Sequence, residues 1–136
     1  MAGSSSFWAD LASDLENPEF LREFVVESIR IATIDEVMNA LDAARGAAGL
    51  SKAELARAIQ VEPATIRRLF ASEKSNPTLG TLAEVAAALG MKITLEPFAD
   101  GERTQITEPL LAGRTADPVG LARHLQGMRT GSKVRA

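Results

Sequence analysis

The chain contains no cysteine and no tyrosine, and its aromatic residues are five phenylalanines and one tryptophan. Without thiols, disulfide bonds and thiolate metal sites are excluded. Because aromatic residues are few, the core is expected to consist of alanine, leucine, isoleucine and valine, which favours close-packed helices. No apolar run approaches the roughly 20 residues of a membrane-spanning helix. The first six residues have neither the positive charge nor the apolar run of a secretory signal, so a cytoplasmic protein is expected.

Histidine is almost absent too. His124 is the only one, so the residues for a catalytic triad or a zinc site are missing, and His124 is expected on a solvent-facing helix surface. Acidic residues of the N-terminal third fall on polar helix faces, where solvation explains them better than paired-carboxylate hydrolysis does. No glycine-rich phosphate loop occurs. We therefore expect no enzyme, and predict no catalytic residue, cofactor or metal.

The net charge of −3 is unevenly distributed. Residues 1–44 carry nine acidic and two basic side chains, whereas residues 45–74 carry six basic and three acidic ones. Residues 101–136 repeat that balance of six to three. A local basic face can bind phosphate even when the whole protein is mildly acidic. The central segment is thus the expected nucleic-acid-binding part, and the acidic segment would suit a basic protein partner.

Helical signals cover the first 50 residues. Asn17, followed by proline, is typical of a cap and a first helical residue. A capping-box pattern of Thr33 and Glu36 predicts that a new helix begins there, and Gly49 is expected to end it. The N-terminal segment is therefore expected to form helices of its own.

Beyond residue 90 the period changes. Met91, Ile93 and Leu95 alternate with polar residues, which is the pattern of a half-buried strand. The Asp-Gly pair at 100–101 is a hairpin signal, so residues 103–107 are expected to return as a partner strand. Because one hairpin is marginal by itself, it is expected to pack on the helices or to pair across a dimer.

Residues 50–70 are the most informative stretch. Ser51 and Glu54 form a second capping-box pattern, which predicts the start of a short helix. Its apolar stripe consists of Leu55, Ala56 and Ile59.

A tight turn leads from this helix to a second one, where Pro63 suits the first helical turn. Ile66 and Leu69 are expected to face the first helix, which leaves three residues pointing outward: Thr65, Arg67 and Arg68. A short helix with an apolar back and a basic front suits the DNA major groove.

This segment resembles the helix-turn-helix domain of the XRE family, which includes lambda-type Cro and repressor proteins. The stretches 47–56 and 76–91 look like the family's entry and closing helices, so the resemblance covers roughly residues 34–97 in order and spacing. It implies a mainly α, lambda-repressor-like bundle that binds double-stranded operator DNA as a homodimer in the bacterial cytoplasm or nucleoid.

Three segments are predicted. Residues 1–33 form an N-terminal helical extension, and residues 34–97 the helix-turn-helix domain with a short C-terminal β-strand. Residues 98–136 supply the returning hairpin strand, a short helix and, from Gly127, a flexible basic tail.

The resemblance also implies the DNA-contacting residues. Those that begin the second motif helix approach base edges, namely Glu62, Pro63, Ala64 and Thr65. Arg67 and Arg68 can bond guanine or phosphate at two points. The positions expected to contact the DNA backbone are Lys52, Thr65, Lys74, Ser75 and Asn76.

This sequence departs from the family pattern at three positions. Gln60 stands where glycine is common in the turn, Glu62 replaces the usual Ser or Thr cap, and Phe70 replaces Glu. These departures bear on how the domain docks on DNA and leave the fold unchanged.

Several functions remain open within this resemblance. Residues 69–79 with 91–97 most resemble HigA-like antitoxins, which repress their own operon and bind a small basic ribonuclease toxin. A temperate-phage immunity repressor or another stand-alone regulator is the alternative, and the segment after residue 97 fits it. A protein-interaction module without DNA binding is a third reading, supported by Glu62 and the net acidity. Four aromatic residues are expected to pack locally or to form a groove for a partner: Phe7, Trp8, Phe20 and Phe24.

Overall fold

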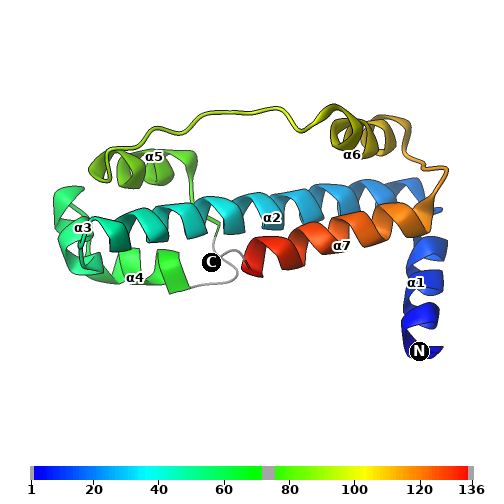
Figure 1. Cartoon of the computed structure of the whole chain (residues 1–136), viewed down its shortest axis with the longest axis horizontal. Helices are drawn as coiled ribbons and strands as arrows, with labels where there is room; N and C mark the ends of the chain where they lie inside the picture. Colours follow the sequence, from blue (N-terminus) through cyan, green and yellow to red (C-terminus); the bar gives the residue numbers. More distant parts are fainter. Residues whose placement is uncertain (1, 72–75, 135–136) are drawn as a thin grey trace. The chain divides into compact units, whose positions relative to one another are not determined.

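The computed structural model describes residues 2–71 and 76–134, without the side chains of 2–5 and 130–134. This part of the chain forms seven α-helices and no strand (Figure 1). They are α1 (Ala2–Asp14), α2 (Pro18–Ala47), α3 (Lys52–Ala58), α4 (Pro63–Ala71), α5 (Leu79–Ala88), α6 (Asp100–Ala112) and α7 (Pro118–Val134). The prediction of a mainly α protein is confirmed. None of the described helices is long and apolar enough to cross a bilayer.

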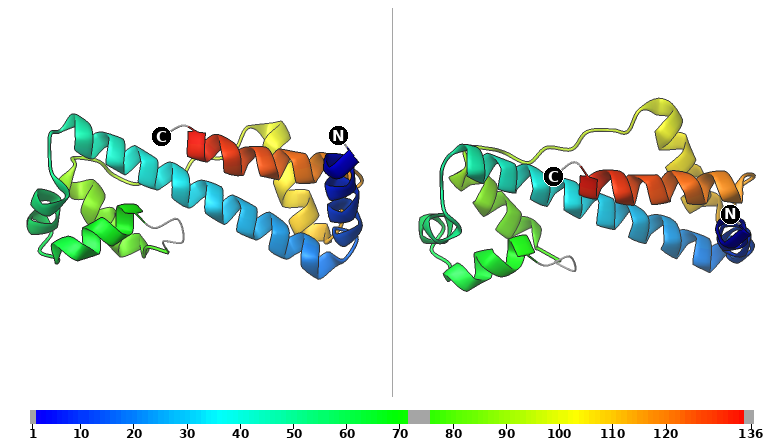
Figure 2. Two further views of the ribbon diagram at one scale, coloured as in Figure 1. Left: turned by 90° about the horizontal axis from the view of Figure 1, so that it is seen from below. Right: turned by 60° about the horizontal axis from the view of Figure 1, so that its bottom comes forward.

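The helices divide into two compact units. Of the described residues, unit 1 takes those up to Ala32 and Glu96–Val134, and unit 2 takes those of Thr33–Leu95. In unit 1, α7 lies beside the first part of α2 and runs in the same direction (Figures 1 and 2). The buried core of unit 1 consists of Leu15, Leu21, Val25, Ile106, Leu121, Ala122 and Leu125.

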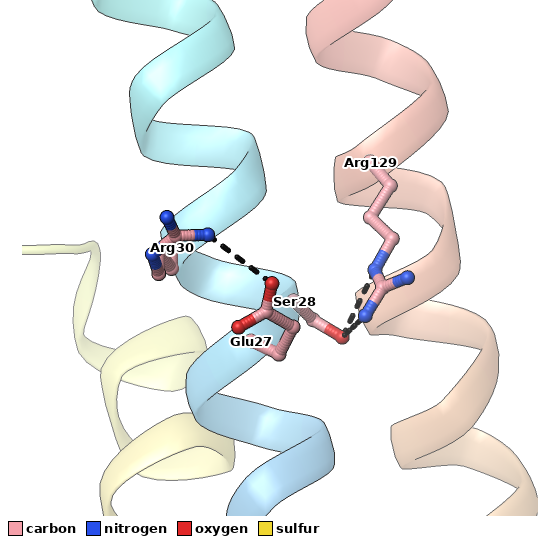
Figure 3. Close-up of polar contacts among 4 residues, drawn as sticks. All are labelled: Glu27, Ser28, Arg30 and Arg129. Carbon is pink, nitrogen blue, oxygen red and sulfur yellow. Dashed lines mark hydrogen bonds and ion pairs between the residues drawn. The ribbon is translucent and has the colours of Figure 1, made fainter. Parts of the chain in front are cut away.

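Two arginines hold unit 1 together by polar contacts between helices. Arg22 on α2 donates from Nε to the Leu110 carbonyl at 2.9 Å, near the end of α6, where helix carbonyls lack partners within the helix. Arg129 on α7 donates to the Oγ of Ser28, from Nε at 3.1 Å and from Nη2 at 2.8 Å (Figure 3). Ser28 is completely buried, so these bonds satisfy an oxygen that water cannot reach.

Unit 2 consists of α3, α4 and α5 around the last part of α2, as Figure 2 shows. The apolar residues expected to join the two motif helices do so, because Leu55 and Ala56 of α3 and Ile66 and Leu69 of α4 share one buried cluster. The other buried members of the cluster are Leu41, Val85 and Ala86. The core of unit 2 therefore fixes how α4 lies against α3.

The helix start predicted at Thr33 is wrong, because α2 continues through this residue from Pro18 to Ala47. Asn17 does cap α2, since its Oδ1 accepts from the Glu19 amide at 2.9 Å and from the Phe20 amide at 3.2 Å. A capping residue needs unpaired amides at a helix end, and inside a continuous helix none are left. Extending an existing helix is easier than nucleating a new one, and α2 has no glycine before residue 46.

The prediction of a C-terminal hairpin is also wrong. Residues 91–99 are neither helix nor strand, and the expected return strand at 103–107 lies within α6. Asp100 opens α6 instead of a turn, because acidic residues in a first helical turn interact favourably with the helix dipole. The flexible tail predicted from Gly127 is helical as far as Val134. Asp117 caps α7, since its Oδ1 accepts from the Gly120 amide at 3.0 Å.

Candidate nucleic-acid interface

The predicted capping box at the start of α3 is confirmed. The Glu54 amide donates to Ser51 Oγ at 3.0 Å, and the Ser51 amide donates to Glu54 Oε1 at 2.9 Å. The Ser51 amide is the main cause that lowers the pKa of the Glu54 carboxyl, with the Ser51 hydroxyl and Arg57 adding to it. These reciprocal bonds define where α3 begins.

Arg45 fixes the turn between α2 and α3. Its Nε donates to Asp42 Oδ1 at 2.9 Å, and its Nη1 donates to the Leu50 carbonyl at 2.7 Å. The side chain is only 20% exposed. Arg45 therefore holds the entry to the motif in place, and one of the six basic charges of residues 45–74 is committed to an internal contact.

The turn between α3 and α4 centres on Gln60, whose backbone has a φ of +59°. The Gln60 amide donates to the Arg57 carbonyl at 3.2 Å, and the Val61 amide donates to the Ala56 carbonyl at 3.0 Å. This is a Schellman helix ending, whose left-handed position is usually glycine. Gly90 holds the same position after α5, with a φ of +72°. The turn thus has the regular geometry, but a glutamine occupies a strained position in it.

The outer face of α4 follows from the two residues that α4 buries. Ile66 and Leu69 are 0% and 8% exposed and anchor α4 in the core of unit 2. Successive residues of an α-helix are about 100° apart around its axis, so Arg68 lies nearly opposite Ile66 and Arg67 nearly opposite Leu69. Both arginines are exposed. The packing therefore presents the two arginines together on the solvent-facing side of α4.

The other predicted DNA-contacting residues fall into three groups. Glu62 and Asn76 are exposed, and Lys52, Pro63, Ala64 and Thr65 are half-buried. Lys74 and Ser75 lie outside the described residues. All the described ones belong to α3, to α4, to the turn between them or to the segment before α5, so unit 2 contains the whole described set.

Glu62 begins α4 with its backbone, because its carbonyl accepts from the Thr65 amide at 2.9 Å. Arg57, one of the six basic residues of positions 45–74, is not among the predicted DNA contacts. Arg57 is exposed in the last turn of α3, beside the turn that leads to α4.

The predicted aromatic residues lie in unit 1. Trp8, Phe20 and Phe24 are half-buried against its core, and Phe7 is 52% exposed, with its ring 5.0 Å from that of Trp8. The guanidinium of Arg123 lies 5.4 Å from the Trp8 ring, so the arrangement resembles local packing more than an open groove.

His124 was expected to face solvent, but the structure contradicts this prediction. Its side chain is 27% exposed, and its Nε2 lies 3.2 Å from Glu102 Oε2 without the alignment of a hydrogen bond. Glu102 belongs to α6, a segment for which the sequence predicts a hairpin. Within the described residues, no three His, Asp or Glu side chains are grouped as metal ligands would be.

Comparison with known proteins identifies one part of the chain. The family described as Helix-turn-helix matches residues 41–95. The match begins within α2 and contains the whole of α3, α4 and α5. The chain matched no curated protein and no solved structure.

Proposed function

We propose that this chain, which carries an XRE-type helix-turn-helix domain at residues 41–95, is a repressor that binds operator DNA sequence-specifically as a homodimer. The domain is that of DNA-binding transcription regulators. One observation carries the proposal. Ile66 and Leu69 fix α4 in the core, while Arg67 and Arg68 remain exposed on the helix that this family places in the major groove.

Base reading is assigned to the surface centred on Ala64 and Arg68. An exposed arginine can bond the two acceptors of a guanine edge, and an alanine methyl can contact a thymine methyl. Arg67, the neighbouring residue on the same exposed side of α4, is proposed to bond a phosphate. Lys52 and Asn76 are proposed as further backbone contacts, together with Lys74 and Ser75.

The acidic Glu62 beside this surface opposes phosphate binding by charge repulsion. This repulsion lowers the sequence-independent part of the affinity for DNA. Contacts to the bases then contribute a larger share of the total affinity. Such a domain would bind DNA of random sequence weakly, and raised salt would weaken this binding further.

Titration with DNA from upstream of the chain's own reading frame tests the proposal, with scrambled DNA as the reference. Arg68→Ala is expected to weaken binding to the specific DNA by about 1–3 kcal/mol and to leave binding to scrambled DNA nearly unchanged. Arg67→Ala is expected to weaken both and to reduce the salt slope by about one. Arg103→Ala removes the same charge from an exposed position of α6 and is the matched control.

Three results would overturn this assignment. Equal affinity for the two DNAs would remove sequence specificity, and no binding at low salt would leave a protein-interaction module. If Arg103→Ala weakens binding to the specific DNA as much as Arg68→Ala does, only the overall charge matters.

We further propose that the repressor is the autoregulatory antitoxin of a type II toxin-antitoxin operon, acting in the bacterial cytoplasm or nucleoid. The resemblance to HigA-like antitoxins supports this, and so does the charge of unit 1. Glu19, Glu23 and Glu27 are exposed along the first part of α2, where Val26 is also 53% exposed. An acidic surface with an apolar residue in it suits a small basic toxin.

Pull-down of the tagged chain from its host, with mass spectrometry and sequencing of the co-purified DNA, separates the alternatives. A small basic protein together with the chain's own promoter supports the antitoxin. Promoter or operator DNA without a protein partner supports a phage-type or other stand-alone repressor and overturns the antitoxin proposal. The reading frame next to the gene adds a check, since a small basic toxin and an integrase point to different answers.

A further inference from the structure

An exposed apolar segment follows the helix-turn-helix domain. Residues 91–99 are neither helix nor strand, and every one of them is exposed. Among them are four large apolar side chains, with exposed fractions of 42% for Met91, 39% for Ile93, 99% for Leu95 and 37% for Phe98. Apolar residues gathered in this way on a surface mark an interaction site more often than scattered ones do.

The order of these residues is that of a β-strand without a partner. Met91, Ile93 and Leu95 alternate with polar residues, so in an extended conformation they share one face. The partner strand predicted from the sequence, residues 103–107, is part of α6. In the described chain no other strand is present to pair with it.

The segment is complementary to itself. When two copies of Lys92-Ile93-Thr94-Leu95-Glu96 run antiparallel with Thr94 opposite Thr94, each Lys92 meets a Glu96 of the other copy. Ile93 then meets Leu95, and both lie on the apolar face. Opposite charges and apolar pairs placed directly across two strands stabilise the pairing. A shift by one residue would put apolar side chains opposite charged ones.

Pro97 fits the same register. If the two Thr94 residues exchange main-chain hydrogen bonds, Lys92 and Glu96 do so as well, because bonded and non-bonded pairs alternate along an antiparallel ladder. Pro97 then stands opposite Met91 in a non-bonded pair, where its missing N–H costs nothing. The proline therefore allows this register and helps to end the pairing of the two strands.

We propose that residues 92–96 of two copies of this chain pair antiparallel about Thr94 and form the two-fold interface of the homodimer. This is a pairing between chains and is distinct from the hairpin that α6 excludes. It rests on the homodimer of the proposed function and supplies its two-fold axis. A two-stranded ribbon is marginal by itself, so the free dimer is weak, and an operator that holds both copies strengthens it by proximity.

Charge reversal tests the ribbon without DNA. In Lys92→Glu both cross-strand pairs become acidic, and in Glu96→Lys both become basic. Each variant is expected to dissociate at concentrations about tenfold higher than the unchanged chain, or more, in sedimentation equilibrium at low salt. Glu108→Lys and Arg114→Glu reverse exposed charges elsewhere in the chain and are the matched controls.

Mixing gives the decisive measurement. When Lys92→Glu is mixed with Glu96→Lys, both cross-strand pairs join opposite charges again, so a heterodimer is expected at the affinity of the unchanged chain. The double variant Lys92→Glu/Glu96→Lys is likewise expected to dimerise. Thr94→Pro removes the central donors and is expected to abolish dimerisation while leaving the helical circular dichroism unchanged.

The ribbon is overturned if the unchanged chain stays monomeric at millimolar concentration, or if the single variants dimerise as the unchanged chain does. It is also overturned if mixing the two single variants does not restore a dimer. The same holds if the backbone amides of residues 92–96 become protected from exchange only when a different protein binds. None of these results uses DNA, so the Arg68→Ala titration still decides the proposed function by itself.

Discussion

Replacing Gln60 by glycine is expected to stabilise the protein, although the change removes a side chain from the centre of the motif. At a φ of +59° the β-carbon of Gln60 lies too close to the backbone. A left-handed residue other than glycine costs about 1–2 kcal/mol. Glycine avoids this cost but loses about 0.5–1 kcal/mol through its greater freedom in the unfolded chain.

The difference is a gain of roughly 0–1.5 kcal/mol in the free energy of unfolding. For a unit of this size, each kcal/mol gained raises the melting temperature by about 4–8 °C. Gln60 is exposed, and the amides of Gln60 and Val61 keep their acceptors in the variant, so little else should change. Urea and thermal unfolding followed by circular dichroism would measure it.

Gly90→Ala is the matched control, because Gly90 has the same position in its helix ending, and nothing lies within 4 Å of the β-carbon that alanine would add. It isolates the cost of the backbone conformation and is expected to destabilise by about 1 kcal/mol. If Gln60→Gly lowers the stability while Gly90→Ala behaves as expected, the glutamine side chain stabilises the turn and the strain argument fails.

Three further changes test the contacts that hold the helices. The pKa of Glu54 is lowered in the folded chain, chiefly by the Ser51 amide, so Glu54 stabilises above its ordinary pKa of 4.5 and this effect is lost as pH falls through the lower folded value. Glu54→Gln should therefore flatten the acid side of a plot of urea midpoint against pH, and an unchanged plot would refute this. Arg129→Ala leaves the buried Ser28 hydroxyl without its donor and should cost about 1–3 kcal/mol in urea unfolding, whereas a cost near zero would show that water replaces the guanidinium. Gly113→Ala combines a φ of +74° with a β-carbon 2.9 Å from Nη2 of Arg22, so it should destabilise the protein more than Gly90→Ala does. An equal loss of stability in the two variants would mean that the Arg22 side chain moves aside freely.

Two capping-box patterns with the same spacing had different outcomes. Ser51 and Glu54 cap α3, whereas Thr33 and Glu36 lie inside α2. The difference lies in the residues before each pattern. A left-handed glycine at position 49 ends the helix before Ser51, and nothing comparable interrupts the chain before Thr33. A cap forms only where amides are free, and that depends on the preceding segment.

The candidate DNA surface could be predicted in part. The burial of Ile66 and Leu69 follows from helical spacing, and the exposure of Arg67 and Arg68 follows from that burial. Which exposed residues contact DNA remains a prediction. That Arg45 is committed to an internal contact could not be foreseen, because a basic residue near a helix end looks the same whether or not it bonds a neighbouring carbonyl.

The sequence by itself determined the helix-turn-helix: its caps, its strained turn and its buried stripe. All of these depend on residues a few positions apart, whose geometry the backbone sets. Only the tertiary structure decided that residues 100–112 form a helix, that His124 meets Glu102, and that Arg129 bonds the buried Ser28 101 positions earlier. Such pairings leave no local pattern, because they form only when separate helices bury their apolar faces together.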